Sequence, residues 1–194
     1  MPRPPRFRHP EAIYHVFTRG AAARRIFSGD DAKWMALWIM EDTVRRHDWE
    51  CSSWCLMNTH YHLLVATPNA DISAGMKRLN WLYARTFNSE TGGAGHVFAE
   101  RYRAVFIQSD EHFFEALRYI VLNPVRAGIC STPDQWRWSS YTDLAHERSS
   151  FMNPNPVLRR FSDDPARARD AYRHFVYEGI GAPPPPYAAD ERIP

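Results

Sequence analysis

The chain has no long hydrophobic run. No stretch of its 194 residues is apolar over the about 18 positions that a membrane-spanning helix requires. The segment from Met1 to Arg6 is rich in proline and arginine and lacks the apolar core of a signal peptide. We therefore expect a soluble, cytoplasmic protein with no membrane partner.

Cysteine is scarce. Cys51, Cys55 and Cys130 are odd in number and follow no paired spacing, so we expect reduced thiols and no disulfide framework. Cys51 and Cys55 lie about 13 Å apart if they share a strand, which is too far to bind one zinc ion together. A zinc knuckle built from these cysteines and the nearby histidines is therefore not expected.

Lysine is nearly absent, and the net charge is only +2. Of the 24 basic residues 22 are arginine, whose planar guanidinium suits two-point contacts with phosphate. A compositional bias of the genome would explain the arginines equally well. The charge therefore gives no large field for a polyanion and leaves nucleic acid binding open.

Apolar side chains are plentiful, at 44% of the residues with seven tryptophans and eleven phenylalanines. This supply and the chain length indicate one domain with a packed core. We divide the chain into a basic arm (1–10), a main domain (11–145), an extension with one helix (146–180) and a proline-rich, disordered tail (181–194). No internal repeat is present.

The pattern of strand and helix signals predicts an α+β fold. Strands are expected over 12–18, 49–57, 60–67 and 101–107, and helices over about 30–47, 71–87, 110–123 and 164–178. The third helix should end at Asn123, because Pro124 disfavours its continuation. The order of the elements fits a ferredoxin-like sandwich, an antiparallel sheet with helices packed on one face, followed by a C-terminal helical extension.

Helical spacing indicates which side chains are buried. In the first helix the expected apolar stripe is Trp34, Leu37, Trp38 and Val44. In the second helix the stripe is Ile72, Met76, Leu79, Tyr83 and Phe87. The second stripe leaves Lys77, Arg78, Trp81 and Arg85 directed toward solvent or a ligand.

A His-x-His pair lies in the third strand. Side chains alternate along a strand, so His60 and His62 project from one face with their backbones about 6–7 Å apart. Two imidazoles at this spacing can bind one divalent ion. Taken alone, the pair is explained at least as well by two polar residues on a half-exposed strand.

The helix over 110–123 carries Tyr119. At 100° per residue its core stripe consists of Phe113, Phe114, Leu117, Ile120 and Val121. Tyr119 lies outside that stripe, on a flank shared with His112, Ala116 and Asn123. If this flank covers His60 and His62, the site holds two imidazoles, an amide oxygen and a phenol. Such a set suits metal-assisted attack of the phenol on a phosphodiester, with a covalent phosphotyrosine.

Four ordered motifs within residues 11–145 carry a resemblance to a known family. They are Tyr14-His15-Val16 with Arg19-Gly20, HYHLL at 60–64 after a Leu-Met dipeptide, RYIVLNPVRAG at 118–128, and WSSY at 138–141. Together they resemble the REP-associated tyrosine transposases, which are HUH single-tyrosine transposases of the insertion-sequence 200 type. The chain differs in having Asn58-Thr59 where the family usually has Pro-Asn, and Tyr61 where it usually has an aliphatic residue.

The resemblance implies a transposase that cleaves and rejoins single-stranded or hairpin DNA through a 5′-phosphotyrosine in the bacterial cytosol. By it Tyr119 is the nucleophile, His60, His62 and Asn123 are ligands of Mg²⁺ or Mn²⁺, and the main domain is catalytic. DNA-backbone contacts are expected from Arg19, Arg101, Arg103, Arg118 and Arg126. The protein is expected to be a monomer or a dimer.

Several residues keep simpler interpretations. For His15 and His112 we expect one ordinary hydrogen bond each, ahead of the alternative that they contact the metal ion or a phosphate. Trp81, Trp136 and Trp138 are candidates for stacking on unpaired bases, although core packing is the commoner role of tryptophan. Two other functions remain open: a domesticated DNA-binding protein without strand transfer, and a phosphohydrolase that uses water and not Tyr119.

Overall fold

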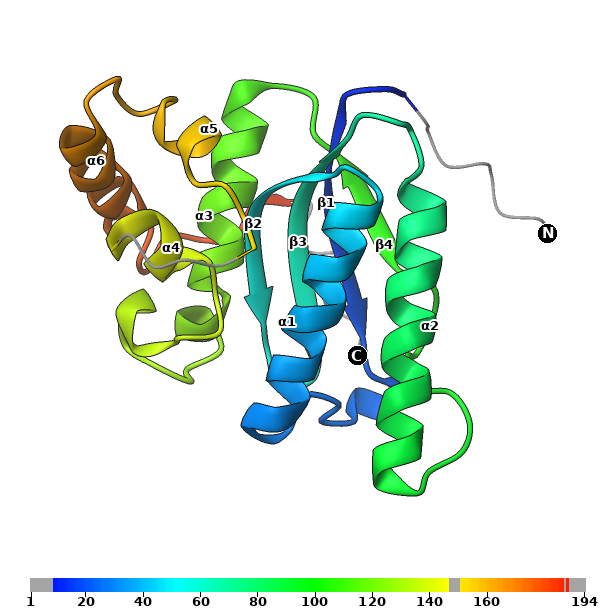
Figure 1. Ribbon diagram of the computed structural model, residues 1–194. Helices are drawn as coiled ribbons and strands as arrows, with labels where there is room; N and C mark the ends of the chain where they lie inside the picture. The colour runs from blue at the N-terminus through cyan, green and yellow to red at the C-terminus, as the bar shows by residue number, and fades with distance from the viewer. Residues whose placement is uncertain (1–8, 147–150, 187, 189–194) are drawn as a thin grey trace.

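The computed structural model describes residues 9–146, 151–186 and 188, so most of the expected basic arm lies outside the described residues. Its centre is a four-stranded antiparallel sheet made of β1 (Ala12–Arg19), β2 (Glu50–Leu56), β3 (His60–Thr67) and β4 (Arg103–Phe106). The strands lie in the order β2-β3-β1-β4 (Figure 1). Every pairing is antiparallel, as expected for the ferredoxin-like sandwich that the order of the elements predicts.

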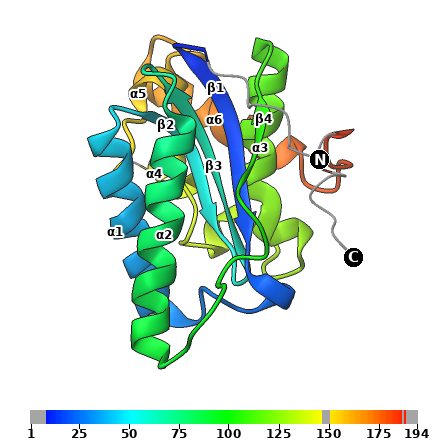
Figure 2. The same cartoon turned by 90° about the vertical axis from the view of Figure 1, so that its right-hand side faces the viewer.

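Three long helices cover the sheet from both sides. The helices are α1 (Gly29–Arg46), α2 (Ile72–Thr91) and α3 (Asp110–Arg126). Figure 2 shows α1 and α2 on one face and α3 on the other. The α+β, ferredoxin-like class is confirmed, and the expectation of helices on one face holds for α1 and α2. Because these two already fill that face, the apolar stripe of α3 is buried against the opposite face.

The helix stripes are confirmed for α2 and partly wrong for α1. All five residues of the expected α2 stripe are buried. In α1, however, Trp34 and Trp38 are 58% and 63% exposed, whereas the smaller Ala36, Ile39 and Met40 are buried. The contact side of α1 is set by these residues, since α1 packs closely beside α2 and a bulky indole does not fit between them.

Helix α3 continues past Pro124 to Arg126, where the sequence predicts an end. Proline has no N–H, so only the bond to the carbonyl of Ile120 is lost. The next turn remains closed by bonds from Ala127 N to Asn123 O (2.9 Å) and from Ile129 N to Pro124 O (2.9 Å). Gly128, with φ of 67°, then ends the helix in the left-handed conformation that glycine favours.

The C-terminal extension packs beside α3. Two 3₁₀ turns are present, η1 (Ala21–Ala23) after β1 and η2 (Pro133–Gln135) after α3. After η2 the chain forms α4 (Tyr141–His146), α5 (Asn155–Leu158) and α6 (Pro165–Glu178). The predicted α6 is present, capped by the Asp164 side chain, which accepts a hydrogen bond from Arg167 N (2.9 Å). The short helices α4 and α5 were not predicted from the sequence. Helix α6 contacts both α3 and α4, so the extension is packed onto the body of the fold.

The first part of the proline-rich tail has a defined position, which differs from the expected disorder. Residues 179–184 and the side chains of Leu122, Val125 and Arg126 line a cavity of about 420 Å³ at the end of α3. Gly179 permits this approach, because a Cβ there would lie 2.5 Å from Arg118 Cδ. The tail beyond residue 186, apart from Ala188, lies outside the described residues.

All three cysteines are free, as expected. Within the described ranges no helix is long and apolar enough to cross a membrane.

Candidate active site

The two histidines lie at the start of β3, on the sheet face that α3 covers. His60 pairs with Arg19 of β1, and His62 pairs with Phe17. The turn before them is held by a hydrogen bond from Gly20 N to Thr59 O (2.8 Å). A Cβ on Gly20 would lie 2.5 Å from the Arg24 carbonyl oxygen, so only glycine allows this close approach. The end of β1 therefore fixes the turn that presents His60.

The bulk of Tyr61 does not disturb this presentation. Tyr61 points to the opposite face, where it is buried and its hydroxyl donates to Asn80 Oδ1 of α2 (2.6 Å). The departure from the family pattern at this position is thus absorbed between the sheet and α2. His60 and His62 lie on the other face, toward α3.

Both histidines are held in the neutral form. The rings of His60 and His62 are 5.0 Å apart and nearly perpendicular, at 83°. Burial lowers the pKa of His60 to about 4, helped by the positive charge of Arg19. Burial, with smaller contributions from His60, His15 and Arg19, lowers the pKa of His62 well below its ordinary value. A neutral imidazole is the form that binds a metal ion.

Each histidine contacts a neighbour through its Nδ1 atom. Thr59 Oγ1 lies 2.9 Å from His60 Nδ1, and His15 Nε2 lies 3.0 Å from His62 Nδ1. His15 is fully buried, and burial lowers its pKa to about 3, with a smaller effect from His112. His15 does make a hydrogen bond, as its simpler interpretation required. The partner of His15 is His62, a candidate metal ligand. This contact could be predicted only from the pairing register of β1 with β3.

Tyr119 reaches the histidines from α3. Its ring lies 6.0 Å from that of His62 and 5.9 Å from that of His15, edge-on to both. The side chain is 7% exposed, yet it is not part of the continuous apolar core. Tyr119, outside the α3 core stripe, therefore lies against imidazoles and not within the apolar core. The two parts of the expected site, on β3 and on α3, lie side by side.

Arg126 and Asn123 flank the tyrosine. The Arg126 guanidinium lies 5.2 Å from the centre of the Tyr119 ring, in cation–π geometry. Asn123 is buried, and its amide nitrogen donates to the Tyr119 carbonyl oxygen (3.1 Å). The amide oxygen of Asn123 is then the atom of this side chain that suits a cation.

The five arginines expected to bind DNA are placed differently. Arg19 lies beside the histidines, Arg103 is on the same sheet face opposite Phe17, and Arg126 lies over Tyr119. Arg118 instead stacks on Phe175 of α6, with its guanidinium 4.7 Å from the ring centre. Arg101 lines a groove beside α2. Three of the five therefore surround the candidate site and two do not.

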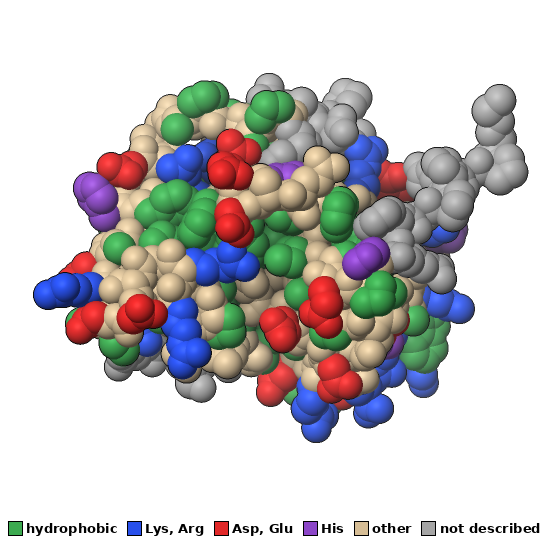
Figure 3. Space-filling view, turned by 90° about the horizontal axis from the view of Figure 1, so that it is seen from above, with side chains coloured by type: hydrophobic (Ala, Val, Ile, Leu, Met, Phe, Trp, Pro, Cys, Tyr) green, Lys and Arg blue, Asp and Glu red, His purple; other side chains and the backbone are tan. Residues whose placement is uncertain are grey.

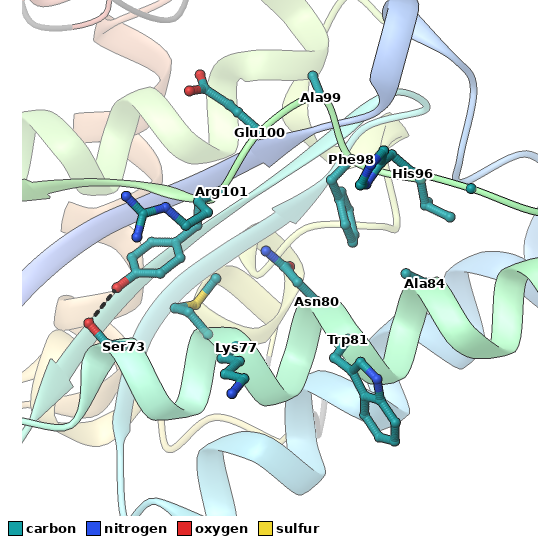
Figure 4. A pocket seen from close by; sticks show the side chains of 14 residues that line it. Ser73, Lys77, Asn80, Trp81, Ala84, His96, Phe98, Ala99, Glu100 and Arg101 are labelled. Atoms are coloured by element: carbon teal, nitrogen blue, oxygen red, sulfur yellow. Dashed lines mark hydrogen bonds between the residues drawn. The ribbon is translucent and has the colours of Figure 1, made fainter. Parts of the chain in front are cut away.

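The groove beside α2 has a volume of about 730 Å³ and lies between α2 and residues 95–102. Figure 4 shows α2 on one side and the segment with Phe98 and Arg101 on the other, with Trp81 extending from α2 at the rim. Tyr102 and Ser73 close one end by a hydrogen bond of 3.1 Å. We call this feature the α2 groove. It adjoins the histidine end of the sheet, because Ala99 N donates to Arg19 O (2.9 Å).

The tryptophans considered for base stacking differ in exposure. Trp81 is 55% exposed, whereas Trp138 is buried. Trp136 is half-buried and donates from Nε1 to the Leu56 carbonyl oxygen (3.0 Å). Core packing therefore accounts for Trp136 and Trp138, and the stacking hypothesis applies only to Trp81.

Charge is mixed on the end of the molecule away from the histidines. Seen from above (Figure 3), acidic and basic side chains are interspersed over this surface. This agrees with the small net charge of +2. Any affinity for a polyanion must come from local groups of arginines and not from the field of the whole molecule.

The donor atoms at the site fit a divalent ion. A ring separation of 5.0 Å allows one nitrogen of His60 and one of His62 to reach the same ion, since metal–nitrogen bonds are about 2 Å long. Among the described residues no cluster of three or more His, Cys, Asp or Glu is placed to bind a metal. The Asn123 amide oxygen, beside Tyr119 on α3, is a candidate for a further protein donor of another type.

Comparison with known structures identifies the fold. A solved structure described as a REP-associated tyrosine transposase bound to a REP hairpin matches with a TM-score of 0.64 and 16% sequence identity. The match covers 78% of this chain and 90% of that one. A putative transposase from Deinococcus radiodurans matches with a TM-score of 0.43 and 18% identity over 66% of this chain and 91% of that one.

No curated protein matches the sequence. The profile of the family described as "Transposase IS200 like" does match, over residues 9–122. This region holds more than half of the chain, including β1 to β4, both histidines and Tyr119. The chain therefore belongs to the IS200-like transposase family.

Proposed function

We propose that this protein is a metal-dependent transposase that cleaves and rejoins single-stranded or hairpin DNA of the REP type. The observation that carries the proposal is the meeting of Tyr119 with His62 and His15 across the sheet face, with ring separations of 6.0 and 5.9 Å. A phenol beside neutral imidazoles fits covalent attack on a phosphodiester better than simple hydrolysis, which needs only water.

In the proposed reaction the Tyr119 oxygen attacks the scissile phosphorus. A bond forms between the phenolic oxygen and phosphorus, and the bond from phosphorus to the 3′-oxygen breaks. The products are a 5′-phosphotyrosine and a strand that ends in a free 3′-hydroxyl, because the phenolic proton passes to solvent and the leaving 3′-oxygen takes up a proton from solvent. The nearby Arg126 cation stabilises the negative charge that develops on the phenol. A later attack by a 3′-hydroxyl reverses these steps and joins the strands.

His60, His62 and the amide oxygen of Asn123 would hold the metal ion. When bound, the ion withdraws negative charge from the scissile phosphate as a Lewis acid. Mg²⁺ prefers oxygen ligands, whereas a first-row transition ion such as Mn²⁺ accepts imidazole more readily. We therefore propose that Mn²⁺ supports activity at least as well as Mg²⁺. Arg19 and Arg103, on the same face, would contact the DNA backbone.

The substrate class is supported by the matching structure, whose description names a REP hairpin. For this chain we propose a hairpin with an unpaired flank, because the tyrosine must reach a phosphodiester that is not constrained within a duplex. The net charge of only +2 argues against tight binding to duplex DNA in general.

The decisive assay uses the full-length protein, Mn²⁺ and 3′-end-labelled hairpin DNA with a single-stranded flank, resolved on a denaturing gel. A labelled band that migrates with the protein supports the proposal. Cleaved DNA without an attached protein would indicate hydrolysis by water. Tight binding without cleavage in either Mn²⁺ or Mg²⁺ would indicate a domesticated DNA-binding protein.

We also propose that the unpaired flank continues from the histidines into the α2 groove. Arg19 borders both, since its carbonyl oxygen accepts from Ala99 N of the groove wall. The groove is largely apolar, and the cationic side chains of Lys77 and Arg101 line it. Arg85 stacks on Trp81 with its guanidinium 5.4 Å from the ring centre. An apolar groove with a cationic border fits bases stacked on Trp81 and phosphates at the border.

Replacing Trp81 with alanine should weaken binding to a hairpin that has an unpaired flank by about 5- to 100-fold, the range expected for one lost base-stacking contact. Binding to the blunt hairpin should not change. Trp38→Ala is the matched control, because Trp38 is equally exposed but lies on α1. Fluorescence anisotropy with both DNAs measures the effect. Equal losses for Trp81→Ala and Trp38→Ala would contradict the proposed path of the strand.

A further inference from the structure

The two histidines of the site are held through the same ring atom. Nδ1 of His60 lies 2.9 Å from Thr59 Oγ1, and Nδ1 of His62 lies 3.0 Å from His15 Nε2. The contact to His60 comes from the turn before β3, and the contact to His62 comes from β1. They have the same effect, because each engages Nδ1 and leaves Nε2 as the ring nitrogen that can serve as a ligand.

We propose that Thr59 and His15 are positioning residues that fix His60 and His62 in the tautomer whose Nε2 atoms bind the metal ion. The inference rests on the proposed function. A neutral imidazole carries one proton, and a ring that donates Nδ1–H to a neighbour has its lone pair on Nε2. Hydrogen bonds of this kind orient metal-binding histidines and set which nitrogen carries the metal.

The chemistry of both neighbours allows them to accept. The Thr59 hydroxyl oxygen accepts the proton of His60 Nδ1. His15 accepts from His62 Nδ1 through its own Nε2, which requires that the His15 proton be on Nδ1. In this arrangement all three imidazoles are neutral, and each carries its proton on Nδ1.

The surroundings prevent these neighbours from turning away. His15 has no exposed surface, and its ring lies beside both that of His62, at 5.2 Å, and that of Tyr119, at 5.9 Å. Thr59 is held by its backbone, since its carbonyl oxygen accepts from Gly20 N (2.8 Å). His15 therefore touches both the candidate ligand and the candidate nucleophile, and it fixes their relative position.

The test compares Thr59→Val with Thr59→Ser. Valine has the shape of threonine without the hydroxyl, and serine restores the hydroxyl. Thr59→Val should weaken Mn²⁺ binding by about 10- to 100-fold, the usual effect of removing such a partner, and Thr59→Ser should bind nearly as the wild type does. Electron paramagnetic resonance of free Mn²⁺ gives the affinity. Thr18→Val is the matched control, because Thr18 pairs with Tyr61 and faces away from the histidines.

A second readout needs no metal. In the metal-free protein, imidazole ¹⁵N shifts should report protonated Nδ1 in His60 and His62 of the wild type. Thr59→Val should move His60 toward a mixture of tautomers, and a purely structural role of the hydroxyl would not. His15→Leu should do the same to His62, and His15→Gln, which restores an acceptor, should reverse it. If His15→Leu fails to fold, His15→Gln still tests the role of His15, and the variants of the half-exposed Thr59 test the role of Thr59.

The outcomes separate this inference from the proposed function. If the wild type binds Mn²⁺ but Thr59→Val and the His15 variants change neither affinity nor tautomer, the positioning roles are overturned while the proposed function stands. If the wild type binds no Mn²⁺ and forms no adduct with DNA, the proposed function fails, and the positioning roles fail with it.

Discussion

Replacing Tyr119 with phenylalanine should abolish the covalent adduct between protein and DNA. The variant lacks the attacking oxygen, and enzymes that lose their nucleophile fall in rate by on the order of 10⁴- to 10⁶-fold. The phenyl ring still fills the space beside His62 and His15, so the fold and DNA binding should persist. Adduct formation on a denaturing gel and DNA affinity by anisotropy, measured on the same preparation, test this expectation.

Tyr83→Phe is the matched control for loss of a buried hydroxyl. The Tyr83 hydroxyl donates to the Ile26 carbonyl oxygen on the other side of the sheet. Its removal should cost about 1 kcal/mol of stability and leave the adduct intact. Strand cleavage that persists in Tyr119→Phe would show that water is the nucleophile and would reject the proposed mechanism.

The second large effect is expected from His62→Gln. The substitution removes one of two imidazole donors but keeps a polar side chain beside His15 and Tyr119, which avoids the cavity that alanine would leave. Mn²⁺ binding should weaken by more than about 100-fold, beyond the usual effect of losing an outer partner. Adduct formation should fall in parallel. Calorimetric titration with Mn²⁺ measures the first effect, and the gel assay measures the second.

The pH dependence of Mn²⁺ binding provides an internal check on this site. Protonated imidazole does not bind a metal, so affinity is lost as the pH falls through the pKa of the ligand. Because burial lowers the pKa of His60 to about 4, and that of His62 well below normal, affinity should hold from pH 8 to about pH 5. Ordinary histidines would begin to release the ion near pH 6.5.

His174→Gln is the control for nonspecific loss of a histidine. His174 lies on α6, is largely exposed and pairs with Glu178 (3.0 Å). Its replacement should change neither Mn²⁺ binding nor cleavage. Unchanged Mn²⁺ affinity in His62→Gln would instead show that the ion, if one binds, is held elsewhere.

Much of the fold could be predicted because its signals are local. The stripe from Ile72 to Phe87 repeats at helical spacing, and every member is buried in the structure. The β-rich segments around His15 and His62 are present as β1 and β3. The stripe containing Trp34 and Trp38 was misplaced because helical spacing cannot show how much room a neighbouring helix leaves. That depends on α2, which lies more than thirty residues further along the chain.

The arginines show the same limit. Sequence proximity to the motifs grouped Arg118 with Arg126. On a helix, however, Arg118 points about 100° away from its neighbour Tyr119, whereas Arg126, seven positions after Tyr119, returns to nearly the same direction. Arg126 therefore lies over the Tyr119 ring, while Arg118 stacks on Phe175 of α6. What Arg118 contacts depends on where α6 packs, and no pattern within α3 contains that information.

The sequence by itself determined the strand and helix order, the shared face of His60 and His62, and the place of Tyr119 outside the core stripe of its helix. These follow from the periods of strands and helices, which act over a few residues. The packed structure was needed to show that α3 covers the histidine face and that His15 contacts both His62 and Tyr119. These contacts join segments up to about one hundred residues apart, because they depend on strand register and on which sheet face remained uncovered.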